Sequence, residues 1–353
     1  MELVTEVLIR LPVKSLIRFR CVCKAWCSLI SSPDFVFMHL IRLHNNEDHP
    51  FLLTLAGFGE KAVCTLRSGL TYKKVTSKDY EIPIAKDLEG IGNYYRYKVC
   101  CGDGLVLLIK VITSEMLLWN PFLGKTRKIP PICSDNTKAA FGLGFDTVRK
   151  DYKLVAIRKH PRVSVEIYKL SSPFWTTITN CNCEESIIRK VDSNGVLMEG
   201  TVHWIAQSSG YIPSHMVLFD VNNEVFNYIM LPKNLRGYLD QKHPILYRGK
   251  VGLLHVVRNH LCSLWVTEND QAQGSWVKLY EVNLGIVGLR GIPYRHRFHV
   301  LSFKKNGQLI FARTQRNGVK LYDFESQETK QLLKTFSHVT MYSTPYKGSL
   351  VLI

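Results

Sequence analysis

The sequence predicts a mainly β protein in which a small helical unit, residues 1–42, precedes a β-propeller of about six blades over residues 50–353. Three observations support this fold class. Apolar residues in the first 42 positions recur at helical spacing. After His49-Pro50 the chain changes to short apolar runs separated by Gly, Pro, Asn and Asp, which is typical of an all-β array. A strand-turn-strand pattern then recurs at about the fifty-residue period of propeller blades.

Four short helices are predicted before residue 42. Leu3, Val7 and Leu8 share one face of the first helix. This helix ends by about Arg10 because Pro12 cannot continue the backbone hydrogen-bond ladder. The inward-facing residues of the second and third helices are Leu16, Phe19, Val22, Cys23, Trp26, Leu29 and Ile30.

The fourth helix is predicted to begin at Ser32-Pro33-Asp34, with Ser32 as its cap and Pro33 in its first turn. Four helices in about forty residues cannot bury all of this apolar surface among themselves. Part of the surface must therefore be covered, and periodicity alone leaves two covers open, the rest of the chain or a partner protein.

The run LVTEVLIRLPVKSLIRFRCVCKAWCSLISSPDFVFMHL, from Leu3 to Leu40, resembles an F-box, with the Leu-Pro-Val-Lys-Ser-Leu turn and the Val-Cys-Lys-x-Trp helix of plant members. The resemblance implies an apolar helix-on-helix contact with the Skp-type adaptor of a cullin ubiquitin ligase. The residues that it assigns to this contact are Leu3, Val7, Leu8, Leu11, Pro12, Leu16, Val22 and Trp26. Most F-boxes begin with a Leu-Pro pair ahead of the first helix, whereas this sequence begins at Met1-Glu2.

Six strand-turn-strand segments, several ending at Pro, define the predicted blades. They are AVCTLRSGLTYKKV from Ala62, LLWNPFLGKTRKIPP from Leu117, VEIYKLSSPFWTTI from Val165, VLFDVNNEVFNYIMLP from Val217, SLWVTENDQAQGSWVKL from Ser263 and KLYDFESQETKQLL from Lys320. Their spacing of about fifty residues is that of kelch-like blades. A two-sheet β-sandwich is the alternative architecture, because irregular blades are difficult to count from one sequence.

Apolar strands led by small residues lie between these segments. They are CGDGLVLL from Cys101, GTVHWIA from Gly200, GKVGLLHVV from Gly249 and NGQLIFA from Asn306. We expect them to be the inner strands of the blades, because glycine permits a close approach near the central channel. The final apolar run, GSLVLI from Gly348, is expected to pair with the first blade and close the ring, which removes an exposed edge.

The same region resembles the plant F-box-associated domain, the companion of such F-boxes, over nearly the whole remainder of the chain. The motifs that carry this resemblance are Cys101-Gly-Asp-Gly-Leu, Leu118-Trp-Asn-Pro, Gly144-Phe-Asp, Asp151-Tyr-Lys-Leu-Val, Val165-Glu-Ile-Tyr, His203-Trp-Ile-Ala and Gly274-Ser-Trp-Val-Lys-Leu. Within this family the chain resembles the S-locus F-box group and its relatives. The substrates of that group include pistil ribonucleases, so the resemblance makes a ribonuclease one expected target.

The chain carries 46 basic and 29 acidic residues, a net charge of +17 that favours acidic partners. Arginine, histidine and proline gather in the segments RKHPR and LRGIPYRHRFH, which cannot continue a strand. If propeller loops bring both segments to one face, their arginines form a candidate target-binding surface. These arginines are Arg158, Arg162, Arg295 and Arg297.

Other functional classes lack their sequence signals. No apolar run reaches the roughly 18 residues of a membrane span, and no signal-peptide pattern precedes the first helix, so we expect a cytoplasmic or nuclear protein. Cys21-x-Cys23 lacks the spacing of a zinc site, and the Gly-Lys-Thr at Gly124 lacks the earlier glycine of a phosphate loop. His203 is expected to be a core histidine. We therefore expect no metal, no cofactor and no catalytic residue.

The two resemblances imply the substrate-recognition subunit of a cullin-type (SCF) ubiquitin ligase. The helices would hold the adaptor and the β domain would hold a target protein, so catalysis is proximity supplied to another protein's chemistry. The alternative is a basic propeller that binds nucleic acid. That function would need exposed aromatic side chains within the basic segments, where Tyr294 and Phe298 stand.

Overall fold

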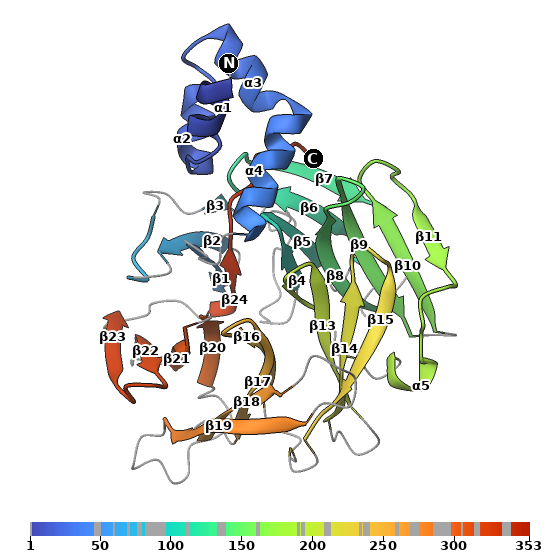
Figure 1. Ribbon diagram of the computed structural model, residues 1–353, viewed down its shortest axis with the longest axis vertical. Helices are drawn as coiled ribbons and strands as arrows, with labels where there is room; N and C mark the ends of the chain where they lie inside the picture. The colour runs from blue at the N-terminus through green and yellow to red at the C-terminus, as the bar shows by residue number, and fades with distance from the viewer. Residues whose placement is uncertain are drawn as a thin grey trace.

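The computed structural model confirms the mainly β architecture, in which short N-terminal helices precede a β-propeller (Figure 1). It describes residues 2–45, 51–58, 61–68, 71–75, 80–81, 97–110, 113–132, 139–159, 163–188, 191, 195–207, 213–232, 235, 241–257, 261–268, 275–284, 298–304, 306–313, 318–333 and 340–353.

The helical unit has the four helices that the periodicity predicts. They are α1 (Glu2–Leu8), α2 (Val13–Phe19), α3 (Lys24–Ser31) and α4 (Pro33–Asn45). The backbone of Pro12 is extended, with φ −63° and ψ 149°, and α2 begins directly after it. Ser32 caps α4, because its Oγ accepts the backbone N–H of Phe35 at 3.3 Å.

In the described part of the propeller the strands form six four-stranded antiparallel sheets, which we number as blades 1 to 6. Blade 1 consists of β24 (Thr340–Tyr346), β1 (Phe51–Phe58), β2 (Lys61–Ser68) and β3 (Tyr80–Glu81). Blade 2 consists of β4 (Tyr97–Gly102), β5 (Leu105–Lys110), β6 (Met116–Asn120) and β7 (Lys125–Ile129). Blade 3 consists of β8 (Ala139–Asp146), β9 (Asp151–Arg158), β10 (Ser164–Lys169) and β11 (Trp175–Ile178).

The remaining three blades follow in chain order. Blade 4 consists of β12 (Val196–Met198), β13 (Thr201–Gln207), β14 (Pro213–Asp220) and β15 (Val225–Met230), and the short helix α5 (Glu185–Ile188) precedes it. Blade 5 consists of β16 (Gln241–Tyr247), β17 (Lys250–Val257), β18 (Leu261–Thr267) and β19 (Trp276–Asn283). Blade 6 consists of β20 (Phe298–Phe303), β21 (Gln308–Arg313), β22 (Val319–Asp323) and β23 (Thr329–Leu333).

The order of strands within a blade corrects one prediction. The strand-turn-strand segments supply the third and fourth strands of blades 2 to 6, and the segment from Ala62 supplies the third strand of blade 1. The glycine-led runs supply second strands and not the inner ones. The inner strands are the first of each blade, since β4 contacts β8 and β24, and β12 contacts β8 and β16. The glycines belong instead to the turns between first and second strands, where Gly104, Gly200, Gly249 and Gly307 have φ between 74° and 85°.

The ring closes through the last strand of the chain. β24 pairs with β1 from Tyr346 opposite Phe51 to Thr340 opposite Ala56. A C-terminal strand therefore completes the first blade, but it lies ahead of the GSLVLI run that the sequence favoured. That run forms no strand, because the carbonyls of Ser349 and Val351 accept hydrogen bonds from a side chain, Asn120, rather than from a neighbouring strand.

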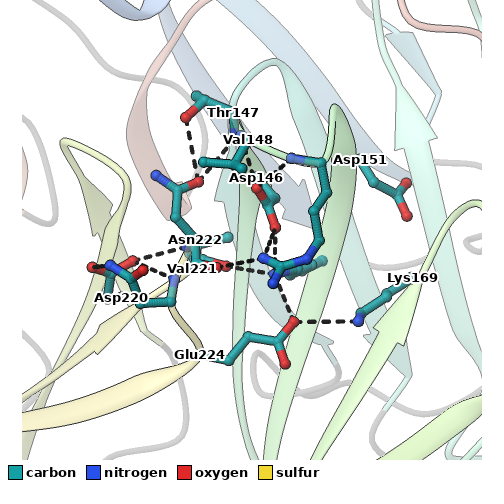
Figure 2. A network of polar contacts seen from close by, with 12 residues as sticks. Asp146, Thr147, Val148, Asp151, Lys169, Asp220, Val221, Asn222 and Glu224 are labelled. Atoms are coloured by element: carbon teal, nitrogen blue, oxygen red, sulfur yellow. Dashed lines mark hydrogen bonds and ion pairs between the residues drawn. The ribbon is translucent and has the colours of Figure 1, made fainter.

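A buried polar network joins blades 3 and 4 (Figure 2). Lys153 of β9 is 1% exposed, and its Nζ lies 2.5 Å from Asp146, 2.6 Å from Glu224 and 2.8 Å from the carbonyl oxygen of Val221. Burial alone would raise the pKa of Asp146 and of Glu224. The bonds and charge of Lys153, together with Arg149 at Asp146 and Lys169 at Glu224, outweigh burial and hold both pKa values below their usual range. The network thereby fixes the turn between β8 and β9 against the next blade.

We predict that Lys153→Met lowers the free energy of unfolding by about 3–5 kcal/mol, because it removes the buried cation that the buried Asp146 and the half-buried Glu224 share. Denaturant unfolding followed by circular dichroism measures the change. Lys128→Met is the matched control, since Lys128 is 83% exposed and lies 3.6 Å from Glu115. Its loss should cost less than about 1 kcal/mol. Equally small changes in both variants would contradict the assigned role of the network.

Candidate functional site

The helical unit presents apolar side chains to solvent. Four of the eight residues assigned to the adaptor contact are exposed, namely Leu3, Val7, Pro12 and Val22. Leu3 is 79% exposed, Val7 62% and Val22 60%. Large apolar side chains that stay this exposed on a small folded unit indicate a binding surface. We call these four residues the docking surface.

The other four assigned residues support the docking surface from behind. Leu8 and Leu16 are 1% and 0% exposed and lie in the core of the helical unit. Leu11 and Trp26 are half-buried and pack against the same core. The ring centroid of Trp26 lies 5.4 Å from that of Phe19. The structure thus separates the predicted set into an exposed layer and a packing layer.

Local geometry at the start of α3 places Val22 outside and Trp26 inside. Cys23 is the cap of α3, and its Sγ accepts the backbone N–H of Trp26 at 3.4 Å. Basic side chains are also exposed on this part of the unit, at Arg10, Lys14, Arg18 and Lys24. The arrangement suits a partner that offers an apolar groove with acidic groups beside it.

α4 fixes the helical unit to the propeller. Leu40 is 4% exposed and lies in the core shared by blades 2 and 3, and Phe37 packs against this core. The rings of Phe37 and Phe145 lie 6.0 Å apart, and Lys150 Nζ lies 4.4 Å from the centroid of Phe37. The propeller therefore covers the apolar face of α4, whereas the docking surface stays exposed.

A buried histidine ties α4 to the first two helices. His39 is 1% exposed, and its Nε2 lies 3.0 Å from the carbonyl oxygen of Leu11. Burial lowers the pKa of His39, with a smaller contribution in the same direction from Arg42, so the ring is neutral at pH 7. Because a carbonyl oxygen only accepts, Nε2 must carry the hydrogen of this bond.

The two faces of the propeller carry different connections. The β8–β9 turn, flanked by Phe145 and Lys150, lies on the face that meets α4. Antiparallel strands reverse direction at each turn, so the strand ends that lead from second to third strands and from blade to blade lie on the opposite face. The strand ends that border both predicted basic segments lie there, at Arg158 and Ser164 and at Asn283 and Phe298.

Of the four predicted target-binding arginines, the structure describes Arg158. Its guanidinium lies 3.2 Å from Glu166 and donates to Ser164 Oγ at 3.0 Å, so this charge is already paired within blade 3. Three further arginines, Arg162, Arg295 and Arg297, lie outside the described residues, and so does Tyr294.

His203 and Cys100 carry side chains that acid–base or nucleophilic chemistry could use, and both are buried. His203 is 2% exposed, its Nδ1 lies 3.0 Å from the carbonyl oxygen of Thr201, and burial lowers its pKa to about 4. Burial raises the pKa of the Cys100 thiol to about 12. Within the described ranges no cluster of His, Cys, Asp or Glu is arranged to hold a metal ion, and no helix is long and apolar enough to cross a membrane.

The contacts between the helical unit and the propeller were not predicted from the sequence. Phe37, Leu40 and Ile41 fall at helical spacing and form an apolar face of α4, so periodicity held this signal. No comparable local signal marks Leu350, which is 1% exposed and lies in the core of the helical unit. Its neighbours come from the opposite end of the chain.

Comparisons with known proteins agree with this architecture. The family model described as the F-box domain matches residues 1–38, and that described as the F-box associated beta propeller domain matches residues 60–353. An F-box/kelch-repeat protein of Arabidopsis thaliana is 26% identical over 296 residues, covering 80% of this chain and 79% of that protein. A second F-box/kelch-repeat protein of this plant is 26% identical over 321 residues, and the match covers 82% of this chain and 69% of that protein.

Among solved structures, TolB from Acinetobacter baumannii superposes with a TM-score of 0.52 at 9% sequence identity. The superposition covers 88% of this chain and 70% of TolB. At this identity the likeness concerns the fold alone. The predicted domain limits, residues 1–42 and 50–353, stay predictions.

The division into an exposed and a packing layer predicts that substitutions in the two layers change stability by different amounts. Leu16→Ala should lower the free energy of unfolding of the helical unit by about 2–5 kcal/mol, because it opens a cavity in the core. Val22→Ala should change it by less than about 0.5 kcal/mol, because Val22 is mostly exposed. Amide hydrogen exchange across α1 to α4 reports both changes. Equal protection in the two variants would show that the layers are assigned wrongly.

Proposed function

We propose, because this chain belongs to the F-box proteins that carry an F-box-associated β-propeller domain, that it is the substrate-recognition subunit of an SCF ubiquitin ligase. The observation that carries the proposal is the exposure of Leu3, Val7 and Val22 within the unit that matches the F-box. An apolar surface of this kind is covered when a partner helix packs on it.

In this function the chain contributes position and no chemical step. The docking surface binds the Skp-type adaptor and, through it, the cullin scaffold. The propeller binds a target protein and holds it near the ubiquitin-loaded enzyme, which raises the effective concentration of the target lysine. Such a subunit works in the cytoplasm or the nucleus, where the ligase and its targets meet.

The face opposite α4 is the proposed target-binding face. The strand ends that border both basic segments lie on this face, and the chain carries a net charge of +17. Arginine binds carboxylates through paired charge-assisted hydrogen bonds, so an acidic surface is the expected feature of the target. The resemblance to the S-locus group makes a pistil ribonuclease the first target to test.

The docking prediction concerns the exposed residues. Leu3→Glu with Val7→Glu should weaken binding of a purified Skp-type adaptor by about tenfold or more, because both carboxylates would have to be buried in an apolar contact. Isothermal titration calorimetry measures the affinity. Val148→Glu is the matched control, since Val148 is 73% exposed but lies on the propeller, and it should bind as wild type does. An affinity unchanged in the double variant would refute the assignment of the adaptor contact.

The target prediction concerns the basic segments. Changing Arg162, Arg295 and Arg297 to Glu should slow association with an acidic target severalfold at low salt, and the difference should shrink as salt rises. Biolayer interferometry with a candidate ribonuclease measures the rate. Arg158→Glu alone should instead lower stability, because it places a second carboxylate beside Glu166. A target that binds wild type but associates at an unchanged rate with the triple variant would place the binding face elsewhere.

A further inference from the structure

The C-terminal tail, residues 347–353, lies between the helical unit and the propeller. β24 ends at Tyr346, and the chain then leaves the sheet; Figure 1 shows the C-terminus beside α4. Leu350 is 1% exposed and packs in the core of the helical unit. The next residue, Val351, packs against the core of blades 2 and 3, as does Ile353. Neighbouring residues of the tail therefore belong to two different cores.

Polar contacts hold the tail to both units as well. Asn120 of blade 2 is 0% exposed, and its Nδ2 donates to the carbonyl oxygens of Ser349 and Val351, each at 3.0 Å. Lys347 Nζ donates to the carbonyl oxygen of Leu43 at 2.6 Å, near the end of α4. One buried amide thus fixes the tail to the propeller, and one lysine fixes it to the last helix.

The choice of asparagine at position 120 is specific to this contact. Asn120 begins the turn between β6 and β7, where its Oδ1 accepts the backbone N–H groups of the residues two and three positions later. Asp220 and Asp323 begin the corresponding turns of blades 4 and 6 and accept the same two N–H groups. A carboxylate therefore suffices for the turn. The amide adds the donor that the tail carbonyls require, which a carboxylate lacks.

We propose that Asn120 and the C-terminal tail are positioning elements that fix the direction of the docking surface relative to the target-binding face. The inference rests on the proposed function, because it concerns how the ligase presents a bound target. A target held on a loose joint would spread over a larger volume, and its lysines would meet the ubiquitin-loaded enzyme less often. The tail removes this freedom by filling the space between the two cores.

The test uses the full chain with Asn120→Asp, which keeps the turn acceptor but turns a carboxylate toward the tail carbonyls. Lysine-specific cross-linking with mass spectrometry reports the relative position of the units. In wild type, Lys14 and Lys24 of the helical unit should link to one fixed set of propeller lysines. The variant should add links to lysines on other blades, such as the exposed Lys250 and Lys330.

Leu350→Ala removes the contact of the tail with the core of the helical unit. It should likewise add cross-links from the helical unit to lysines on other blades. It decides the question if Asn120→Asp disturbs the propeller, which a far-ultraviolet spectrum reveals. Leu352→Ala is the matched control, because Leu352 belongs to the same tail but is 61% exposed, and it should give the wild-type pattern. The inference would be overturned if Leu350→Ala and a folded Asn120→Asp both gave the same cross-link pattern as the wild type.

A second readout separates positioning from simple loss of stability. In a ligase reconstituted with adaptor and cullin, Asn120→Asp should retain its affinity for the adaptor, because the docking surface is unchanged. More propeller lysines should receive ubiquitin in Asn120→Asp than in the wild type, because the wild-type tail holds the two units in one relative orientation. Failure of the wild-type chain to bind the adaptor would refute the proposed function, and the cross-links of the free chain would still decide the positioning role.

Discussion

The pairing of β24 with β1 is the contact on which the rest of the structure depends. It joins the two ends of the chain in one blade by backbone hydrogen bonds and leaves the ring without an open edge there. β1 follows α4, and the C-terminal tail follows β24. Closing the ring therefore also brings the tail to the helices, where Leu350 packs in the helical core.

Two buried polar side chains, Lys153 and Asn120, stabilise the contacts between the propeller and the helical unit with its tail. Lys153 holds the turn between β8 and β9, which contacts α4 through Phe145 and Lys150. Asn120 holds the tail. Both have several hydrogen-bond or ionic partners, as buried polar groups require, because an unpartnered one would cost more free energy than its contacts return. The contacts of Lys150, Phe145 and the tail with the helical unit thus lie on one face of the propeller.

Much of the fold followed from local sequence signals. The spacing of apolar residues and the positions of Pro12 and Ser32 predicted four helices, and the turns between short apolar runs predicted six hairpins. The same signals misplaced the inner strands. A glycine-led run reports the backbone conformation of the turn before it, as at Gly104 and Gly249, and says nothing about distance from the propeller axis.

The sequence by itself determined the element types, the order of the two units and the residues of the F-box motif, because each depends on neighbours within a few positions of the chain. Only the tertiary structure separated the exposed Leu3 and Val7 from the buried Leu8, since burial on one helical face depends on what packs against it. The role of Asn120 was also decided there. Its amide bonds the carbonyl of Ser349 across 229 positions, and no local pattern encodes a contact between residues that meet only when the ring closes.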